Sequence, residues 1–266
     1  MRLERIDLAD LGNPTQIARA VLAQAKLPPG SVPVEEIARA LDIQEIQTLD
    51  TDAFEGALIT DAAKSTGVIL VRKSYPERRR YTIGHELGHF LCPYHVPHGA
   101  GFHCSTEDML SEGTGKPNWE ADANVFAAEL LMPYAPFLQD VRKGSFELER
   151  LIPLAKRYEV SKTACVRRAI GLKEYIAAAF LSKGQRVVSP IYRSEEFPFV
   201  VLKKGMQIPR GSLTHRFQGA PGALSSMDSS EFSFWTDAPP RNREIFEQVL
   251  VQENGFRLTL LVLEET

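Results

Sequence analysis

The segment His85-Glu86-Leu87-Gly88-His89 limits the fold more than any other part of the sequence. Two histidines four residues apart lie on one face of a helix, from which both imidazoles can reach a single ion. The flanking sequence predicts a helix over residues 77–91, because Pro93 then ends the helical pattern. The preceding residues 52–71 predict a β-hairpin that ends in the β-branched run 67–71.

This residue pattern is typical of a metal site that hydrolyses a bond. Zinc suits imidazole ligands and lowers the pKa of a bound water toward neutrality, so attack by hydroxide is feasible at pH 7. We therefore predict that His85 and His89 bind one zinc ion and that Glu86 takes a proton from the water. Chance produces roughly 0.01 such motifs in a chain of this composition. The alternative is two solvent-facing histidines beside a surface glutamate.

A catalytic zinc usually has three protein ligands, and His95 is one candidate for the third. His95 stands ten residues after His85, which is the spacing of the pattern HExxHxxGxxH. That pattern needs a glycine where this chain has Cys92, and cysteine tolerates a positive φ poorly. With His95 as a ligand, Met109 or Met132 would belong to a Met-turn.

Glu120 is the other candidate, and we favour it. Asn118 is a suitable cap for a second helix that ends before Pro133, and Glu120 lies in its first turn. Asn124 follows one turn later on the same face. A carboxylate ligand from a second helix, with a polar residue that orients a ligating histidine, is a gluzincin arrangement.

Three segments together resemble the ImmA/IrrE-type zinc metallopeptidases: GVILVRK, RRRYTIGHELGHFL and WEADANVFAAELLMP. The resemblance covers roughly residues 30 to 175. It implies that His85, His89 and Glu120 hold one zinc ion and that Glu86 is the catalytic base. It also implies a protein substrate, namely a helix-turn-helix repressor of the Xre type, whose cleavage releases stress-response or mobile-element genes.

The remaining cysteines and histidines near the motif each have two interpretations. Cys92 is a buried apolar residue or a thiol close to the metal. His98, His103 and Cys104 lie in a glycine-bearing segment that we expect to be a loop. We interpret these three as ordinary loop residues, with a role in covering the cleft or polarising a carbonyl as the alternative.

The fold class predicted for the whole chain is α+β, in three parts. Residues 1–140 are expected to form a zincin-like metallopeptidase domain with a small mixed sheet, and 141–176 a helix-turn-helix-like helical segment. Residues 177–266 are expected to form a β-rich domain that senses a signal or binds a partner. Its predicted strands are 187–192, 197–202 and 256–265.

The helical segment carries a local excess of positive charge. Between residues 141 and 173 the chain has nine Lys or Arg against three Glu. Lys162, Arg167 and Arg168 would lie on the second helix, which in a helix-turn-helix enters the major groove of DNA. We favour the other interpretation, in which these helices support the catalytic domain and the partner is a protein.

Composition excludes several other classes of protein. With 44% hydrophobic and 24% charged residues, the chain is neither disordered nor a disulfide scaffold. No apolar run approaches the roughly 18 residues of a membrane-spanning helix, so no membrane partner is expected. The first residues lack the apolar core of a secretory signal, and three cysteines suit a reducing compartment, so we expect a cytoplasmic protein.

Two hypotheses of different classes follow from these observations. In the first, the chain is an intracellular zinc endopeptidase that cleaves a helix-turn-helix repressor, with Asn124 orienting a zinc ligand. In the second, it is a non-catalytic regulatory protein with a structural zinc that binds a repressor or DNA. Retention of function after Glu86→Gln would favour the second hypothesis.

Overall fold

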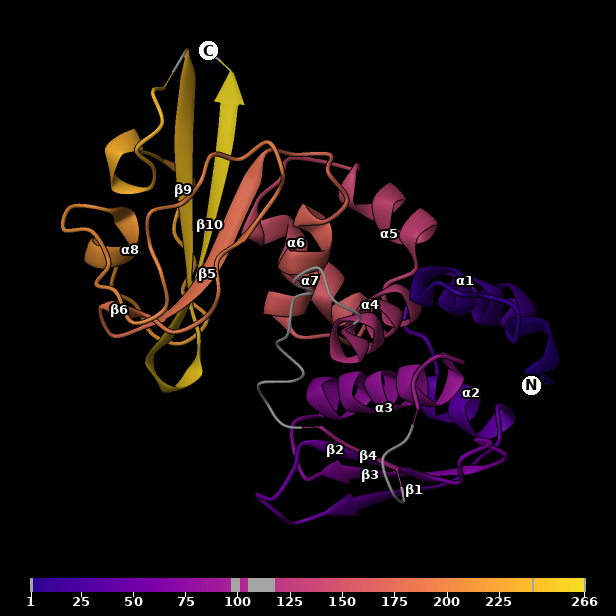
Figure 1. Cartoon of the computed structure of the whole chain (residues 1–266). Helices are drawn as coiled ribbons and strands as arrows, with labels where there is room; N and C mark the ends of the chain where they lie inside the picture. Colours follow the sequence, from indigo (N-terminus) through magenta and orange to yellow (C-terminus); the bar gives the residue numbers. More distant parts are fainter. Residues whose placement is uncertain (1, 97–100, 105–117, 241, 266) are drawn as a thin grey trace. The chain divides into compact units, whose positions relative to one another are not determined.

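A computed structural model shows how the chain folds (Figure 1). It describes all residues except 1, 97–100, 105–117, 241 and 266. The chain divides into two compact units, of which the first comprises residues 1–137 and 157–161 and the second comprises 138–156 and 162–266. The predicted α+β class is confirmed, because both units combine helices with a sheet. The division into three domains at 140 and 176 stays a prediction.

The first unit contains a mixed sheet with the strand order β1-β3-β2-β4. Its elements are η1 (Ile6–Leu8), α1 (Pro14–Ala25), α2 (Val34–Ala40), β1 (Ile43–Leu49), β2 (Gly56–Thr60), β3 (Gly67–Arg72), α3 (Pro76–Leu91), β4 (Gly101–Cys104) and α4 (Trp119–Leu131). β1 runs parallel to β3, whereas β2 is antiparallel to β3 and β4. The predicted hairpin and the helices around it are confirmed. The strands β1 and β4 were not predicted, because β1 has few buried positions and β4 lies in the expected loop.

Helix α3 is the central element of this unit. It packs against β2 and β3 on one side and against α4 on another, and Figure 1 shows it between the sheet and α4. Every residue from Thr82 to Leu91 is consequently buried. A helix that is buried all round is expected to be apolar, yet this stretch contains two histidines and a glutamate. Burying such groups costs free energy unless they have partners, which makes this part of α3 a candidate functional site.

The close approach of α4 to α3 depends on Gly88. A Cβ at this position would lie 3.1 Å from the Cα of Ala123 and 3.1 Å from the Cδ1 of Phe126. Glycine therefore lets the backbones of the two helices come together where a side chain would hold them apart. This contact brings the first turn of α4, with Glu120, beside the buried face of α3.

Lys64, in the turn between β2 and β3, holds the carboxyl end of α3. Its Nζ donates hydrogen bonds of 2.7 Å to the carbonyl oxygens of His89 and Cys92, which lie at the end of the helix. Burial lowers the pKa of Lys64 to about 8 from an ordinary 10.5. A cation at this end of a helix also interacts favourably with the helix dipole.

Replacing Lys64 with Met is expected to lower the free energy of unfolding by about 1.5–3 kcal/mol, because hydrogen bonds from a charged donor are lost. The folded protein binds this proton less tightly than the unfolded chain does. Wild type should therefore gain stability relative to the variant as the pH rises from about 8 toward 10.5. Urea unfolding of both proteins across this pH range measures the difference, and a constant difference would contradict the shifted pKa.

The second unit is built around an antiparallel sheet with the order β6-β5-β10-β9-β8, in which β7 also pairs with β5. Its elements are α6 (Leu148–Arg157, whose last residue belongs to the first unit), α7 (Lys162–Ile170), β5 (Ala177–Lys183), β6 (Arg186–Val187), β7 (Tyr192–Arg193), α8 (Leu213–Arg216), β8 (Asp228–Ser230), η3 (Phe232–Phe234), β9 (Arg243–Val251), η4 (Glu253–Gly255) and β10 (Phe256–Glu265). Helix α5 (Tyr134–Val141) begins in the first unit and ends in this one. The strand-rich character predicted for the C-terminal part is confirmed.

Two of the three strands predicted here need correction. The strand over 256–265 is confirmed. Of residues 187–192, only Val187 belongs to β6 and only Tyr192 belongs to β7, and Pro190 lies between the two short strands. The prediction over 197–202 is wrong, because Pro198 has no N–H to donate to a ladder. This segment still supplies Phe197, Val200 and Leu202 to the core around Trp235, and their burial accounts for its apolar composition.

The helices α6 and α7 occupy the segment predicted to be helix-turn-helix-like. The Cys165 thiol on α7 lies 3.4 Å from the carbonyl oxygen of Leu151 on α6, and α7 packs against β5 and β7. The helix-turn-helix interpretation itself stays a prediction. Within the described residues, no helix combines the length and the apolar character that crossing a bilayer requires.

Candidate metal centre

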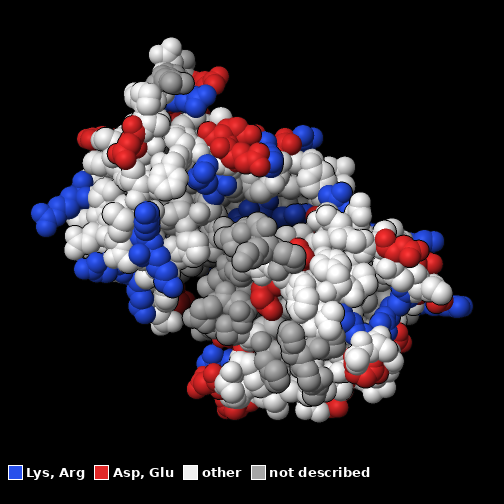
Figure 2. Space-filling model, viewed as in Figure 1, with Lys and Arg blue, Asp and Glu red and all other residues white. Residues whose placement is uncertain are grey.

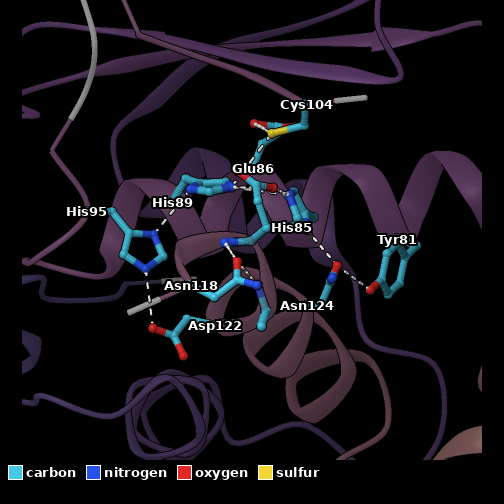
Figure 3. Close-up of polar contacts among 11 residues, drawn as sticks. Tyr81, His85, Glu86, His89, His95, Cys104, Asn118, Asp122 and Asn124 are labelled. Atoms are coloured by element: carbon cyan, nitrogen blue, oxygen red, sulfur yellow. Dashed lines mark hydrogen bonds and ion pairs between the residues drawn. The ribbon is translucent and has the colours of Figure 1, made fainter. Parts of the chain in front are cut away.

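His85 and His89 point to the same place from consecutive turns of α3 (Figure 3). Both side chains are fully buried, and their Nε2 atoms lie 3.1 Å apart. Two unprotonated imidazole nitrogens at this distance repel each other unless a cation lies between them. The helical spacing in the sequence is the direct cause of this geometry.

Glu120 reaches the same place from α4. Its Oε2 lies 3.1 Å from the Nε2 of His85 and 3.4 Å from the Nε2 of His89. Asn118 caps α4 as predicted, because its Oδ1 accepts from the backbone N–H groups of Glu120 and Ala121 at 3.2 Å. The cap thereby fixes the backbone of Glu120 at the start of the helix.

Cys104, the last residue of β4, completes a group of four donors. Its Sγ lies 3.6 Å from the Nε2 of His89, and one ligand atom from each of the four residues lies within 4.8 Å of the others. A tetrahedral zinc with bonds of 2.0–2.3 Å needs donor atoms about 3.3–3.8 Å apart. The described donors, two imidazoles, a carboxylate and a thiol, suit zinc in their chemistry, and the four separations of 3.1–3.6 Å among them are close to this spacing.

Outer partners orient the two histidines. Asn124 Oδ1 accepts a hydrogen bond from the Tyr81 hydroxyl at 2.7 Å and lies 2.9 Å from the Nδ1 of His85. A carbonyl oxygen only accepts, so the Nδ1 of His85 carries a proton, and the Nε2 of His85 faces the other donors. The structure thus brings Asn124 to the position at which the sequence placed it, and its orienting role is part of the proposal below.

His95 contacts the opposite side of His89 from the donor group. Its Nδ1 lies 3.1 Å from the Nδ1 of His89, and its Nε2 lies 3.8 Å from a carboxylate oxygen of Asp122 (Figure 3). Burial lowers the pKa of His95 to about 3, so this imidazole is neutral. Because His95 contacts the outer nitrogen of His89, it lies outside the described donor group, which contains Glu120.

The backbone at Cys92 also differs from the turn that the His95 alternative requires. Cys92 has a φ of −69°, whereas a glycine in the HExxHxxGxxH pattern would serve a left-handed turn. Its side chain is fully buried, and burial raises the pKa of the thiol to about 12. These observations favour the apolar interpretation of Cys92. Met132, proposed for a Met-turn, is buried at the end of α4.

Met109 and His98 lie outside the described residues. His103 pairs through its backbone with Ala57 in the β2–β4 ladder.

Burial and hydrogen bonds together determine the charges of Glu120, His89 and His85. Burial raises the pKa of Glu120, but hydrogen bonds from His85 and His89 outweigh it and hold the pKa well below the ordinary value. Burial lowers the pKa of His89 and keeps this residue neutral. For His85, burial is outweighed by the hydrogen bond to Glu120 and the charge of Glu86, so its pKa is raised. Glu120 is therefore ionised, and its carboxylate can bind a metal cation.

Glu86 lies beside the donor group and is fully buried. Its Oε2 is 3.8 Å from the Sγ of Cys104, and its Oε1 has no hydrogen-bond partner among the described residues. Burial raises the pKa of this carboxyl to about 7. A carboxylate with this pKa can accept and return a proton near neutral pH, as a general base must.

Gly56 on β2 provides the space for the Glu86 carboxylate. A Cβ at Gly56 would lie 2.3 Å from the Oε1 of Glu86 and 2.6 Å from the Cγ2 of Thr82. Gly56→Ala is therefore expected to displace Glu86 and to lower the free energy of unfolding by about 1–3 kcal/mol. Gly12→Ala is the matched control, because nothing lies within 4 Å of its Cβ. Urea unfolding compares them, and equal stability of the two variants would contradict this account.

Sequence reasoning missed the place of Cys104, which it treated as an ordinary loop residue. The β2–β4 ladder places Cys104 opposite Gly56, next to Glu86, and the Cys104 carbonyl accepts from the N–H of Glu55. Cys104 stands 15 residues after His89, too far along the chain for helical spacing to bring the two side chains together. Only the pairing of β4 with β2 brings the thiol to the donor group.

With this geometry established, comparison with known families decides the class of the domain. The model of a peptidase family described as IrrE N-terminal-like domain matches residues 41–169. Residues 41–169 are an IrrE N-terminal-like domain. The resemblance to the ImmA/IrrE family seen in the sequence is thereby confirmed. The matched range of this domain includes α3, α4 and all four residues of the donor group.

The fold of nearly the whole chain is found in a solved structure. A "Mycobacterium tuberculosis transcriptional regulator" matches with a TM-score of 0.60 and 14% sequence identity. The match covers 97% of this chain and 79% of that chain, so the likeness extends beyond the IrrE N-terminal-like domain. At this identity the likeness shows the fold alone. No curated protein matches the sequence.

Proposed function

We propose that the chain is a zinc-dependent endopeptidase that cleaves a protein. The observation that carries this proposal is the buried group of His85, His89 and Glu120 with the Glu86 carboxylate beside it. Membership of residues 41–169 in a peptidase family supports the same chemistry. Zinc at such a site supplies a Lewis acid for the scissile carbonyl and lowers the pKa of water.

In this proposal, each residue of the site has its own role. His85, His89 and Glu120 hold the ion, and Asn124 orients His85 through its Nδ1–H. Glu86 accepts the proton of the attacking water on a carboxylate oxygen and passes it to the leaving amine. Its raised pKa of about 7 suits both steps near neutral pH.

The substrate we propose is a helix-turn-helix transcriptional repressor. Support comes from the family of the domain and from the likeness in fold to a transcriptional regulator. Cleavage of such a repressor would release the genes that it silences. The strand-rich second unit would then recognise this partner or a signal, a role that rests on analogy.

The second candidate function is that of a regulatory protein with a structural zinc. One observation favours it, because four protein donors, with Cys104 as the fourth, are the usual number in structural zinc sites. Direct DNA binding by the basic segment has weaker support. Arg142 pairs with Glu174 and Lys173 with Glu195, both at 2.8 Å. The visible face in Figure 2 carries Lys and Arg side chains in several separate groups.

Capture of partners from the native host with the Glu86→Gln variant tests the proposal. Each captured helix-turn-helix protein is then purified and incubated with wild type in the presence of zinc. We expect at least one repressor that the variant holds intact and that wild type cuts, with no cleavage after a chelator removes zinc. A repressor that binds both forms equally and stays uncut would favour the regulatory function instead.

A further inference from the structure

The position of Cys104 suggests a function beyond hydrolysis itself. Its side chain is 1% exposed, at the end of the edge strand β4, and backbone pairing with β2 fixes its place opposite Gly56. The thiol faces two groups of the proposed active site, the Nε2 of His89 at 3.6 Å and the Oε2 of Glu86 at 3.8 Å (Figure 3). A thiol in this place is therefore close enough to bind the same ion as His89.

A second observation at the same place also indicates a ligand. The Oε1 of Glu86 is buried without a hydrogen-bond partner among the described residues, although burying an unsatisfied carboxylate oxygen is costly. The Glu86 carboxylate thus lies beside the Cys104 thiol and keeps one buried oxygen that no described group satisfies. A cation among the four donors would interact favourably with this carboxylate and would favour the thiolate form of Cys104.

We propose that Cys104 is a fourth ligand of the zinc and keeps the resting site closed. Catalytic zinc sites have three protein ligands and leave the fourth position for water. With the Cys104 thiolate in that position, the two anionic ligands Glu120 and Cys104 balance the charge of the ion. Hydrolysis then requires the thiolate to leave, so the closed site is a latent form of the enzyme. This inference rests on the proposed peptidase function.

X-ray absorption at the zinc edge tests the ligation without any substitution. We expect one sulfur at about 2.3 Å in wild type, together with nitrogen and oxygen ligands at about 2.0–2.2 Å. With cobalt in place of zinc, we expect a thiolate-to-metal charge-transfer band in wild type that is absent in Cys104→Ser and Cys104→Ala. Cys165→Ala is the matched control, because this buried cysteine lies on α7 in the second unit, and it should keep the band.

Cleavage of a confirmed substrate tests the latency. A site that is closed nine-tenths of the time or more should gain about 10-fold or more in cleavage rate when Cys104→Ala removes the thiolate. An ion with only nitrogen and oxygen ligands in wild type overturns the inference and leaves the peptidase function intact. A sulfur ligand in a protein that cleaves nothing, in either form, contradicts the peptidase function and the latency but leaves the ligation standing. A wild-type protein that binds neither ion overturns both proposals.

Discussion

Glu86→Gln is expected to lower the rate of substrate cleavage by about 10²–10⁴-fold, the usual contribution of a general base. The amide has nearly the shape of the carboxylate but cannot accept the proton of the attacking water. Zinc binding should persist, because Glu86 lies outside the group of four donors. Cleavage rates and metal content, measured on the same preparations, separate the two effects.

Glu77→Gln is the matched control for this variant. Glu77 lies in the first turn of the same helix and is exposed, so the substitution makes the same change of charge far from the donor group. Its cleavage rate and zinc content should match those of wild type. Wild-type cleavage by Glu86→Gln would show that Glu86 is not the base, whereas loss of zinc from this variant would show that it is a ligand.

Glu120→Ala is expected to weaken zinc binding by more than the roughly 100-fold that loss of an outer partner can cost. Its Oε2 lies within 3.4 Å of both imidazole Nε2 atoms, so the substitution removes an anionic donor from the group. His95→Ala should cost about 10–100-fold at most, because His95 contacts only the outer nitrogen of His89. Competition with a chromophoric chelator measures both affinities.

The two variants together decide between the candidate third ligands. Retention of zinc by Glu120→Ala with loss in His95→Ala would overturn the choice of Glu120. Asp122→Ala is the control for charge, since Asp122 lies on the same helix and its carboxylate is 3.8 Å from His95. It should bind zinc more tightly than Glu120→Ala does.

Much of the site could be predicted from local sequence rules. Helical spacing alone places His85 and His89 on one face, with Glu86 adjacent, and Pro93 fixes where that helix ends. The cap at Asn118 is likewise a local signal, and it sets the first turn of α4 at Glu120. The prediction over 197–202 was wrong because an apolar run with Pro198 fills the core of the second unit without forming a ladder.

Hydrophobic periodicity and capping rules act over a few residues, and they determined the helix with the two histidines, the helix with Glu120 and the chemistry of their side chains. Only the tertiary structure shows that Glu120, and not His95, belongs to the described group that could hold a metal, because this depends on the approach of α4 to α3 at Gly88. It also decided the place of Cys104, which reaches the group through the pairing of β4 with β2. Neither contact leaves a periodic signal in the sequence, because each joins residues that are distant along the chain through backbone packing.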